Sequence, residues 1–376
     1  MAPTPPPSRP SPLDAVHQEM GATMVDFAGW SMPLRYGSET AEHLAVRSGV
    51  GVFDLSHMGE IELVGAGAGA ALDHAVVSDL SEMVDGRAKY TMLCAPDGGV
   101  LDDLVVYRLA AERWLVIANA ANTLLDLGEL TARAGGFDAT VRDRSEDWAL
   151  VAVQGPGAAS LLAPLVDREL AELRYYAIVP AELEGAGVLL ARTGYTGEDG
   201  FEVLVRPEDA RLVWDRLLER KGEGGKDAAP VPAGLAARDT LRLEAGMPLY
   251  GHELSTARTP YEAGLGRVVA GNGPADYIGR EALRERAGQQ ASERLVGLAS
   301  SGRRVPRAGC PVMAPGSGRK VGEVTSGAPS PTLGKPIAMA YVEASFAEVG
   351  TELRVEVRAS SEPVEVVPLP FYRRPR

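Results

Sequence analysis

The chain of 376 residues has few cysteines, no long apolar run and no excess of positive charge. Its two cysteines, Cys94 and Cys310, are far apart in sequence, which excludes a disulfide scaffold and fits a reducing compartment. No segment approaches the ~18 unbroken apolar residues that a membrane-spanning helix needs. The formal net charge of −13 argues against a nucleic-acid partner, because phosphate binding takes clustered lysine and arginine. A cytoplasmic globular protein is therefore expected.

Two common site signatures are also missing. The five histidines show neither HxH nor HExxH spacing, so no metal site is predicted, and the lone His57 of "SHMGE" is expected to be a structural hydrogen-bonding group. The stretch "GAGAGA" (65–70) fits G-x-G-x-x-A, but no acid closes the following strand about 20 residues on. We interpret it as a turn of small residues rather than a dinucleotide-binding loop.

The pattern along the chain predicts several domains, as the length also does. Residues 1–10 are proline-rich and are predicted to be a disordered tail. Residues 11–285 mix helices, strands and hairpins, which indicates two α+β subdomains rather than a doubly wound parallel sheet. They include a polar surface loop over 220–234. Residues 290–376 contain short strands at hairpin spacing, which predicts a separate small β-barrel.

The stretch "GGVLDDLVVY" (98–107) places two adjacent acids at the start of an apolar strand. Gly98 and Gly99 indicate a hairpin turn, because glycine tolerates positive φ. Side chains alternate across a strand, so Asp103 and Tyr107 share one face while Asp102 lies on the other. We expect one acid to cap backbone N–H groups of a turn. The other, on the side of Tyr107, is free to face a cavity.

The glycine-rich stretch "RTGYTGEDGFEV" (192–203) indicates a tight loop followed by a strand. No Lys-Ser/Thr pair follows the glycines, so the loop is not a P-loop. Tyr195 offers a flat stacking face, and Glu202 offers an acceptor for a heterocycle rich in N–H groups. Alternation along "FEVLV" points Glu202 away from its apolar neighbours, although an ordinary solvent-facing carboxylate fits the pattern equally well.

Two arginines share one face of a predicted helix in "GLAARDTLRLEAGMPLYGHEL" (234–254). Arg238 and Arg242 are four residues apart, so both side chains project from the same side of the helix. A pair of guanidinium groups there suits a carboxylate or the carbonyl of a heterocycle. The alternative is a structural ion pair with Asp239 or Glu244.

These stretches, together with "GATMVDFAGWSMPLRYG", "VFDLSHMGEIEL" and "PFYRR", resemble the aminomethyltransferase, or T-protein, family of the glycine cleavage system. The likeness runs in order from about residue 11 to the C-terminus. It implies two α+β folate-binding subdomains and a C-terminal β-barrel around a central opening. It also implies transfer of an aminomethyl group from the lipoyl arm of the carrier H-protein to tetrahydrofolate, giving 5,10-methylenetetrahydrofolate, ammonia and dihydrolipoyl protein.

The resemblance assigns roles residue by residue. Asp103, the second acid of "DD", matches the family's catalytic aspartate, which sits by the reacting folate nitrogens. The positions that match folate contacts are Met58, Tyr107, Asn119, Tyr195, Glu202 and Arg238. Glu202 is expected to hold the amino edge of the pterin, and the "PFYRR" segment is expected to approach the site. The chemistry implied needs no nucleophile, metal or nucleotide.

Relatives of the family leave alternatives. A folate-dependent demethylase using another one-carbon donor, or a non-catalytic folate-binding protein, would resemble the same motifs. Flavin-linked oxidoreductases of this scaffold need a flavin domain, for which the chain has no room, and "GYTGEDG" lacks the cysteine of the "K-x-C-Y-x-G-Q-E" branch linked to iron–sulfur assembly. We expect a monomer that contacts other glycine cleavage components transiently, with the carrier docking near Arg303, Arg304 and Arg307 of "GRRVPR".

Overall fold

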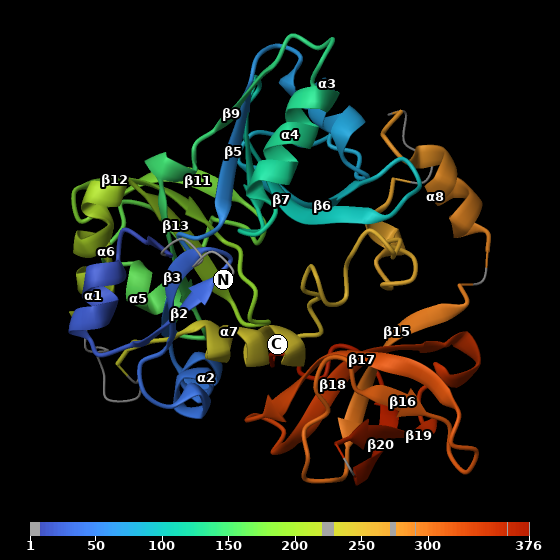
Figure 1. Ribbon diagram of the computed structural model, residues 1–376. Helices are drawn as coiled ribbons and strands as arrows, with labels where there is room; N and C mark the ends of the chain where they lie inside the picture. The colour runs from blue at the N-terminus through green and yellow to red at the C-terminus, as the bar shows by residue number, and fades with distance from the viewer. Residues whose placement is uncertain (1–7, 220–228, 271–275, 290, 359, 376) are drawn as a thin grey trace, which may run out of the picture.

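The computed structural model describes residues 8–219, 229–270, 276–289, 291–358 and 360–375. Two mixed α/β bodies and a closed β-barrel lie at the corners of a triangle (Figure 1). This arrangement confirms the predicted fold class, although the domain boundaries stay a prediction. The first seven residues of the predicted disordered tail and most of the 220–234 loop lie outside the described residues. Arg9–Pro10, which we expected in the tail, instead forms strand β1.

The first body is built on a six-stranded sheet with the order β11-β12-β13-β10-β4-β14. Among the described strand pairs of this sheet, only β4–β14 is parallel. The strands are β4 (Gly51–Asp54), β10 (Ala149–Gln154), β11 (Ile178–Leu183), β12 (Ala186–Ala191), β13 (Gly200–Val205) and β14 (Val231–Pro232). A small sheet beside it contains β1, β2 (Thr23–Phe27) and β3 (Trp30–Arg35).

Helices cover one face of the six-stranded sheet. Residues of α1, α5 and α6 join Val151, Val153 and Val203 in one apolar core. The helices of this body are α1 (Asp14–Glu19), α2 (Glu39–Ser48), α5 (Ala158–Leu162), α6 (Ala210–Glu219) and α7 (Leu235–Glu244). Helix α2 ends at the C-cap Gly49 and is followed directly by β4. Short 3-10 helices occur at Ser145–Asp147, Pro207–Asp209, Gly266–Val268 and Ala344–Phe346.

The second body is built on an antiparallel five-stranded sheet with the order β6-β7-β8-β5-β9. Helices α3 and α4 pack on its outer face against residues such as Ile61, Val106 and Val116. The "GAGAGA" stretch joins β5 to α3, as the small-residue turn predicts. The elements are β5 (Gly59–Val64), α3 (Ala68–Ala75), β6 (Arg87–Cys94), β7 (Val100–Ala110), β8 (Arg113–Ala118), α4 (Thr123–Arg133) and β9 (Thr140–Asp143).

The inner faces of the two large sheets meet in a shared apolar core. Tyr107 and Leu115 of the five-stranded sheet belong to the same buried cluster as Ala152 and Leu204 of the six-stranded sheet, and Leu241 of α7 joins them. Burying these side chains between the sheets removes apolar surface from water and fixes the two bodies against each other. Side chains on the inner faces of β7 and β13 are therefore held close together.

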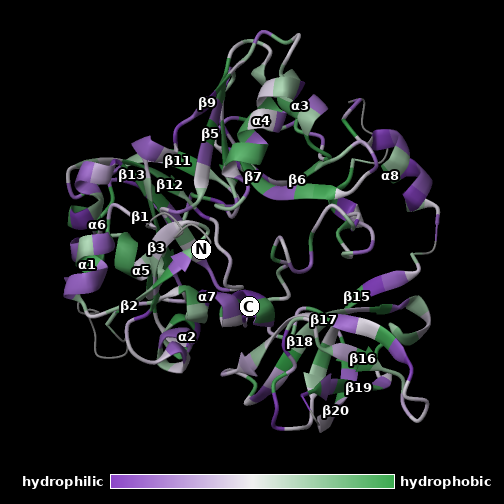
Figure 2. Cartoon of the chain, in the orientation of Figure 1, coloured by the Kyte–Doolittle hydropathy of each residue, from purple (hydrophilic) through white to green (hydrophobic). Residues whose placement is uncertain are grey.

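The barrel closes in the order β15-β18-β17-β16-β19-β20 around a core rich in valine and alanine. Its strands are β15 (Glu293–Ser300), β16 (Pro311–Met313), β17 (Lys320–Ser330), β18 (Lys335–Glu343), β19 (Glu352–Val357) and β20 (Ser360–Val367). The link to the barrel includes α8 (Arg280–Ala287), which Figure 2 colours mostly hydrophilic and which buries only Leu283. Among the described helices, none has the length and apolar character to cross a membrane.

The turn that precedes β7 gives a first test of packing. A Cβ on Gly99 would lie 2.1 Å from the carbonyl oxygen of Thr256, whereas a Cβ on Gly128 in α4 would meet nothing within 4 Å. We expect Gly99→Ala to lower the free energy of unfolding by about 1–3 kcal/mol, because backbone must move to relieve the clash. The matched Gly128→Ala should raise it by about 0.5–1 kcal/mol through helix propensity. Urea denaturation followed by tryptophan fluorescence measures both, and equal stabilities for the two variants would contradict this packing.

Candidate active site

Asp103 lies on the inner face of β7, where two neighbouring strands supply donors to its carboxylate. The Tyr90 hydroxyl of β6 donates to Oδ2 at 3.0 Å, and Nδ2 of Asn119, just after β8, donates to Oδ1 at 2.9 Å. Burial, followed by the charge of Asp102, raises the pKa of Asp103 to about 7. Asp103 is thus suited to gain and lose a proton near neutral pH.

The predicted alternation of β7 is confirmed. Asp102 lies on the opposite face of the strand from Asp103 and is fully buried. It caps a backbone N–H group as expected, but that group belongs to Asn119 at 3.1 Å rather than to the hairpin turn. The turn is capped instead by Asp97, whose Oδ1 accepts from the backbone N–H of Gly99 at 3.1 Å. The reason is that the side chain of Asp102 points toward α4, away from the turn.

Glu202 lies on the inner face of β13 and is joined to Tyr107 through one hydroxyl group. The hydroxyls of Tyr107 and Thr193 are 3.0 Å apart, and Thr193 donates to Oε2 of Glu202. Phe201 and Val203, the strand neighbours of Glu202, point into the opposite core. Burial raises the pKa of Glu202, while Thr193 and the charge of Arg238 oppose the shift. The side chain is thus an acceptor inside the protein, not on a plain surface.

Tyr195 and Arg238 form a stacked pair. The Arg238 guanidinium lies 4.7 Å from the centroid of the Tyr195 ring, and the Tyr195 hydroxyl donates to the backbone oxygen of Pro248. Burial lowers the pKa of Arg238, and its guanidinium forms no hydrogen bond or ion pair with the residues that the structure describes. A planar cation held by an aromatic ring in this way keeps its donors for another group.

Arg242 forms structural ion pairs. This is one of the two alternatives predicted for the arginines, the other being contact with a ligand. The Arg242 guanidinium pairs with Glu253 at 3.0 Å and with Asp239 at 2.7 Å, and it also donates to Ser326 at 2.8 Å. Glu244, the other partner considered, pairs instead with Arg47 and His43. The two arginines of α7 therefore serve different purposes, because Arg242 joins the helix to the barrel.

The turn "SHMGE" brings Met58 and His57 to the inner side of the sheets. Met58 is partly buried and packs against the core shared by Tyr107 and Leu204. His57 is almost fully buried, and burial lowers its pKa to about 3. Its Nδ1 has no hydrogen-bond partner among the described residues, so the expected structural hydrogen-bonding role is wrong. The ring instead packs edge-on against Phe27.

The C-terminal segment returns from the barrel to the glycine-rich loop. Tyr372 donates its backbone N–H to Glu244 at 2.8 Å and its ring lies under the Arg47 guanidinium. Arg374 lies 3.6 Å from Asp199. A cavity of about 400 Å³ is lined by Gly197, Ala245, Met247, Pro370, Tyr372, Arg373 and Arg374. The "PFYRR" segment thus adjoins the loop that carries Tyr195.

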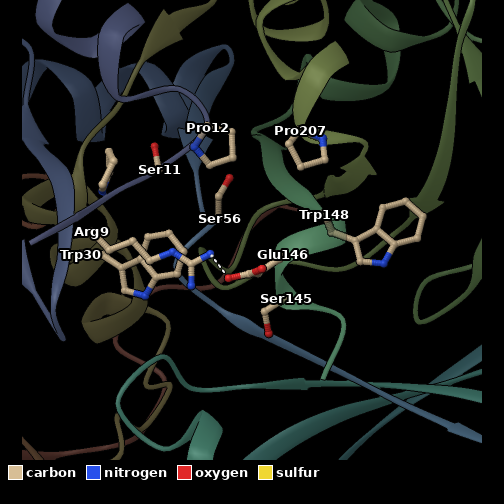
Figure 3. Close-up of a pocket in the computed structure, with 10 residues that line it drawn as sticks. Arg9, Ser11, Pro12, Trp30, Ser56, Ser145, Glu146, Trp148 and Pro207 are labelled. Carbon is tan, nitrogen blue, oxygen red and sulfur yellow. Dashed lines mark hydrogen bonds and ion pairs between the residues drawn. The ribbon is translucent and has the colours of Figure 1, made fainter. Parts of the chain in front are cut away.

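A second cavity, of about 440 Å³, lies apart from these groups (Figure 3). The Arg9–Glu146 ion pair, 3.2 Å long, crosses it, and Trp30 and Trp148 flank it. None of the sequence-predicted site residues lines this cavity. It therefore plays no part in the site around Asp103.

Sequence reasoning missed several groups near Asp103 and Glu202. Burial raises the pKa values of Tyr90 and Tyr176, and the charge of Asp103 adds to both shifts, as does that of Glu202 for Tyr176, so these phenols lie beside the same site as Tyr195. Tyr90 could have been found from the hairpin register, which pairs it with Val105 beside Asp103. No local pattern singles out Tyr176, because it reaches the site through the packing of one sheet on the other.

The grouping has a defined chemical capacity. It combines a carboxyl group that titrates near neutrality, a buried acceptor at Glu202 and a stacked cation at Arg238. Such a set can bind a flat group bearing both N–H donors and carbonyl acceptors, and can move a proton beside it. No three acidic, histidine or cysteine side chains in the described ranges are arranged to hold a metal ion.

Comparison with known proteins gives full-length matches. The GCVT N-terminal domain model matches residues 13–272, and the glycine cleavage T-protein C-terminal barrel domain model matches residues 293–373. Aminomethyltransferases of Streptomyces avermitilis and Rubrobacter xylanophilus are 58% and 44% identical, over 97% and 98% of this chain and 98% and 95% of theirs. The crystal structure of the glycine cleavage system aminomethyltransferase T from Bartonella henselae superposes with a TM-score of 0.90 at 36% identity, covering 97% of this chain and 98% of that one.

The two α/β bodies share a site that carries a carboxyl group, and a closed barrel follows them. Because the two family models match this whole architecture, the chain is an enzyme of the group-transfer class. The chain belongs to the aminomethyltransferase, or glycine cleavage T-protein, family. The resemblance seen in the sequence motifs is thereby confirmed.

Proposed function

We propose that this enzyme transfers an aminomethyl group from the lipoyl arm of the carrier H-protein to tetrahydrofolate. The products are 5,10-methylenetetrahydrofolate, ammonia and dihydrolipoyl protein. The observation that carries the proposal is Asp103, a carboxyl group held by Tyr90 and Asn119 with a pKa of about 7, in a chain that matches aminomethyltransferases from end to end.

The overall reaction defines what the site has to do. Two folate N–H bonds, at N5 and N10, are replaced by bonds to the transferred carbon. That carbon gives up its bonds to the lipoyl sulfur and to the amine, and the two protons lost by folate pass to the sulfur and to the departing amine. Asp103 is the proposed proton carrier beside the folate nitrogens, because its proton affinity lies close to neutral pH.

The remaining predicted site residues are proposed to bind folate. Glu202 accepts from the amino edge of the pterin, the Arg238 donors face pterin acceptors, and Tyr195 supplies a flat surface. Tyr107 and Met58 complete the wall on the side of the shared core. Asn119 also stays a predicted folate contact, although its side-chain amide already donates to Asp102 and Asp103.

The partner and setting are proposed on the same basis. The carrier H-protein is the aminomethyl donor, other glycine cleavage components make transient contacts, and the enzyme acts as a cytoplasmic monomer. Arg303, Arg304 and Arg307 are exposed on the segment between β15 and β16, and Arg304 lies 3.9 Å from Glu362. Their role in carrier docking stays a prediction.

A reconstituted assay tests the function. Purified protein, tetrahydrofolate and an aminomethylated lipoyl carrier should release ammonia and 5,10-methylenetetrahydrofolate in equal amounts, and omission of the protein should abolish the fast release. Folate binding without turnover of this donor would contradict the proposal. It would instead support a demethylase with another one-carbon donor or a non-catalytic folate-binding protein.

A further inference from the structure

Behind Asp103, on the side of β7 that faces α4, lies a second carboxylate that three N–H groups hold. Asp102 is fully buried and accepts from the backbone N–H of Asn119 at 3.1 Å, from Nδ2 of Asn119 at 2.8 Å and from Nδ2 of Asn122 at 2.8 Å. Burial raises the pKa of Asp102, whereas these donors act in the opposite direction and stabilise its ionised form. Asp102 is therefore equipped to carry a negative charge inside the protein.

A third carboxyl group is Asp126 in the first turn of α4. Asp102, Asn119 and Asp126 together are called the array. Asp126 is fully buried, and neither of its oxygens accepts a hydrogen bond from the described residues. Its carboxyl group is within hydrogen-bonding reach of the Asp102 carboxylate. Two buried carboxylates in contact cannot both be ionised at neutral pH. The proton that the two carboxyl groups share resides on Asp126, because the N–H donors all face Asp102. This proton forms the hydrogen bond between Asp126 and Asp102.

Asn119 connects this pair to the reacting side of the strand. Its Nδ2 atom lies 2.8 Å from Oδ1 of Asp102 and 2.9 Å from Oδ1 of Asp103, so one amide group contacts both acids of "DD". The connection places a fixed negative charge next to Asp103 and limits the rotation of both side chains. A carboxyl group beside a like charge gains proton affinity.

We propose that Asp102, Asn119 and Asp126 are positioning residues that set the protonation of Asp103, with Asp126 holding a proton so that Asp102 stays the single charge behind the catalytic carboxyl group. The inference rests on the proposed function only in naming Asp103 as the proton carrier. Asp102 supplies the charge, Asn119 fixes its distance from Asp103, and Asp126 prevents a second charge from forming.

The other groups that face the array leave Asp102 as its dominant charge. Asp103 faces the phenols Tyr90, Tyr176 and Tyr195, whose pKa values burial raises, so they stay neutral. On the far side, Arg133 and the phenol of Tyr250 act at longer range. Arg133 is already paired with Glu129 at 2.7 Å. Burial and the charge of Asp102 raise the pKa of Asp126 to about 10, consistent with a carboxyl group that keeps its proton.

A pH–rate profile tests the role of the Asp102 charge. The double variant Asp102→Asn/Asp126→Asn keeps the shape of the array and removes every charge that it can hold. Since the charge of Asp102 raises the pKa of Asp103, its removal should move the inflection near pH 7 downward by about one unit or more. Asp126→Asn alone replaces a neutral donor with a neutral donor and should leave the inflection in place. A lower rate with an unmoved inflection in the double variant would overturn the proposal.

Infrared spectroscopy tests the Asp126 proton without any substrate. At pH 8 the wild-type protein should show the carbonyl band of a protonated carboxyl group that disappears in Asp126→Asn. Glu60 is also buried, with a pKa raised by burial, and has no hydrogen-bond partner for its carboxyl oxygens among the described residues. Glu60→Gln is thus the matched control, which should remove a different band and leave the pH–rate inflection unchanged. An unaltered carboxyl region in Asp126→Asn would overturn the proposal whatever the activity, whereas failure of aminomethyl transfer alone would overturn only the proposed function.

Discussion

Asp103→Asn is expected to lower kcat for aminomethyl transfer by about 100-fold or more, the usual contribution of a positioned proton-transfer group. The affinity for tetrahydrofolate should change little. Asparagine has the shape of aspartate and can keep hydrogen bonds to Tyr90 and Asn119 after rotation of its amide, but it cannot accept a proton at neutral pH. Steady-state kinetics with saturating carrier and a separate folate titration measure the two quantities.

Asp85→Asn is the matched control for this prediction. Asp85 precedes β6 in the same body, its side chain is 57% exposed, and among the described residues it pairs only with Arg108. The same chemical change there should leave kcat within about twofold, because an exposed ion pair contributes little. Weakened folate binding with normal kcat in Asp103→Asn would mean that Asp103 holds the folate rather than moving protons.

Glu202→Ala is expected to raise the Kd for tetrahydrofolate by about 100-fold or more, while kcat at saturating folate stays within about tenfold. Loss of a carboxylate that accepts two ligand N–H groups removes about 1.5–3 kcal/mol for each bond. Alanine also leaves Thr193 and the charge of Arg238 without their partner on β13. Isothermal titration calorimetry gives the affinity, and kinetics at high folate give kcat.

A second carboxylate of the same sheet provides the control for Glu202. Glu182 on β11 is exposed, and Glu182→Ala should leave folate affinity unchanged. Glu202→Gln keeps the size of the side chain and one acceptor oxygen, so its affinity should fall between those of alanine and wild type. If Glu202→Ala instead abolished turnover at saturating folate with normal affinity, the division of roles between Glu202 and Asp103 would be reversed.

Structural features that depend only on residues close together in the sequence could be predicted. The Gly98–Gly99 turn and the alternation of β7 placed Asp103 and Tyr107 on one face, and the structure confirms both, because side-chain period and turn geometry are local properties. The short strands after residue 290 similarly indicated the barrel. The helical spacing of Arg238 and Arg242 correctly placed both on one side of α7.

The partners of those side chains were not predictable, because packing between distant segments decides them. Arg242 lies against Glu253 and Ser326, whereas Arg238, one turn earlier, lies over Tyr195. Helical spacing does not determine which residues of other segments each arginine contacts. His57 was expected to form a hydrogen bond and instead packs edge-on against the ring of Phe27. Asp126 carried no signal in the sequence, since one acid in the first turn of a helix is common.

The return of the C-terminal segment to the glycine-rich loop has a consequence for biosynthesis. A chain emerges from the ribosome in order, and domains near its start can fold before later ones exist. The two sheets that carry Asp103 and Glu202 emerge before the barrel, yet Tyr372 and Arg374 complete the cavity beside Gly197. A nascent chain can therefore hold the Asp103 carboxyl group in place while one wall of that cavity is still being translated, and the cavity closes only after the barrel has been made.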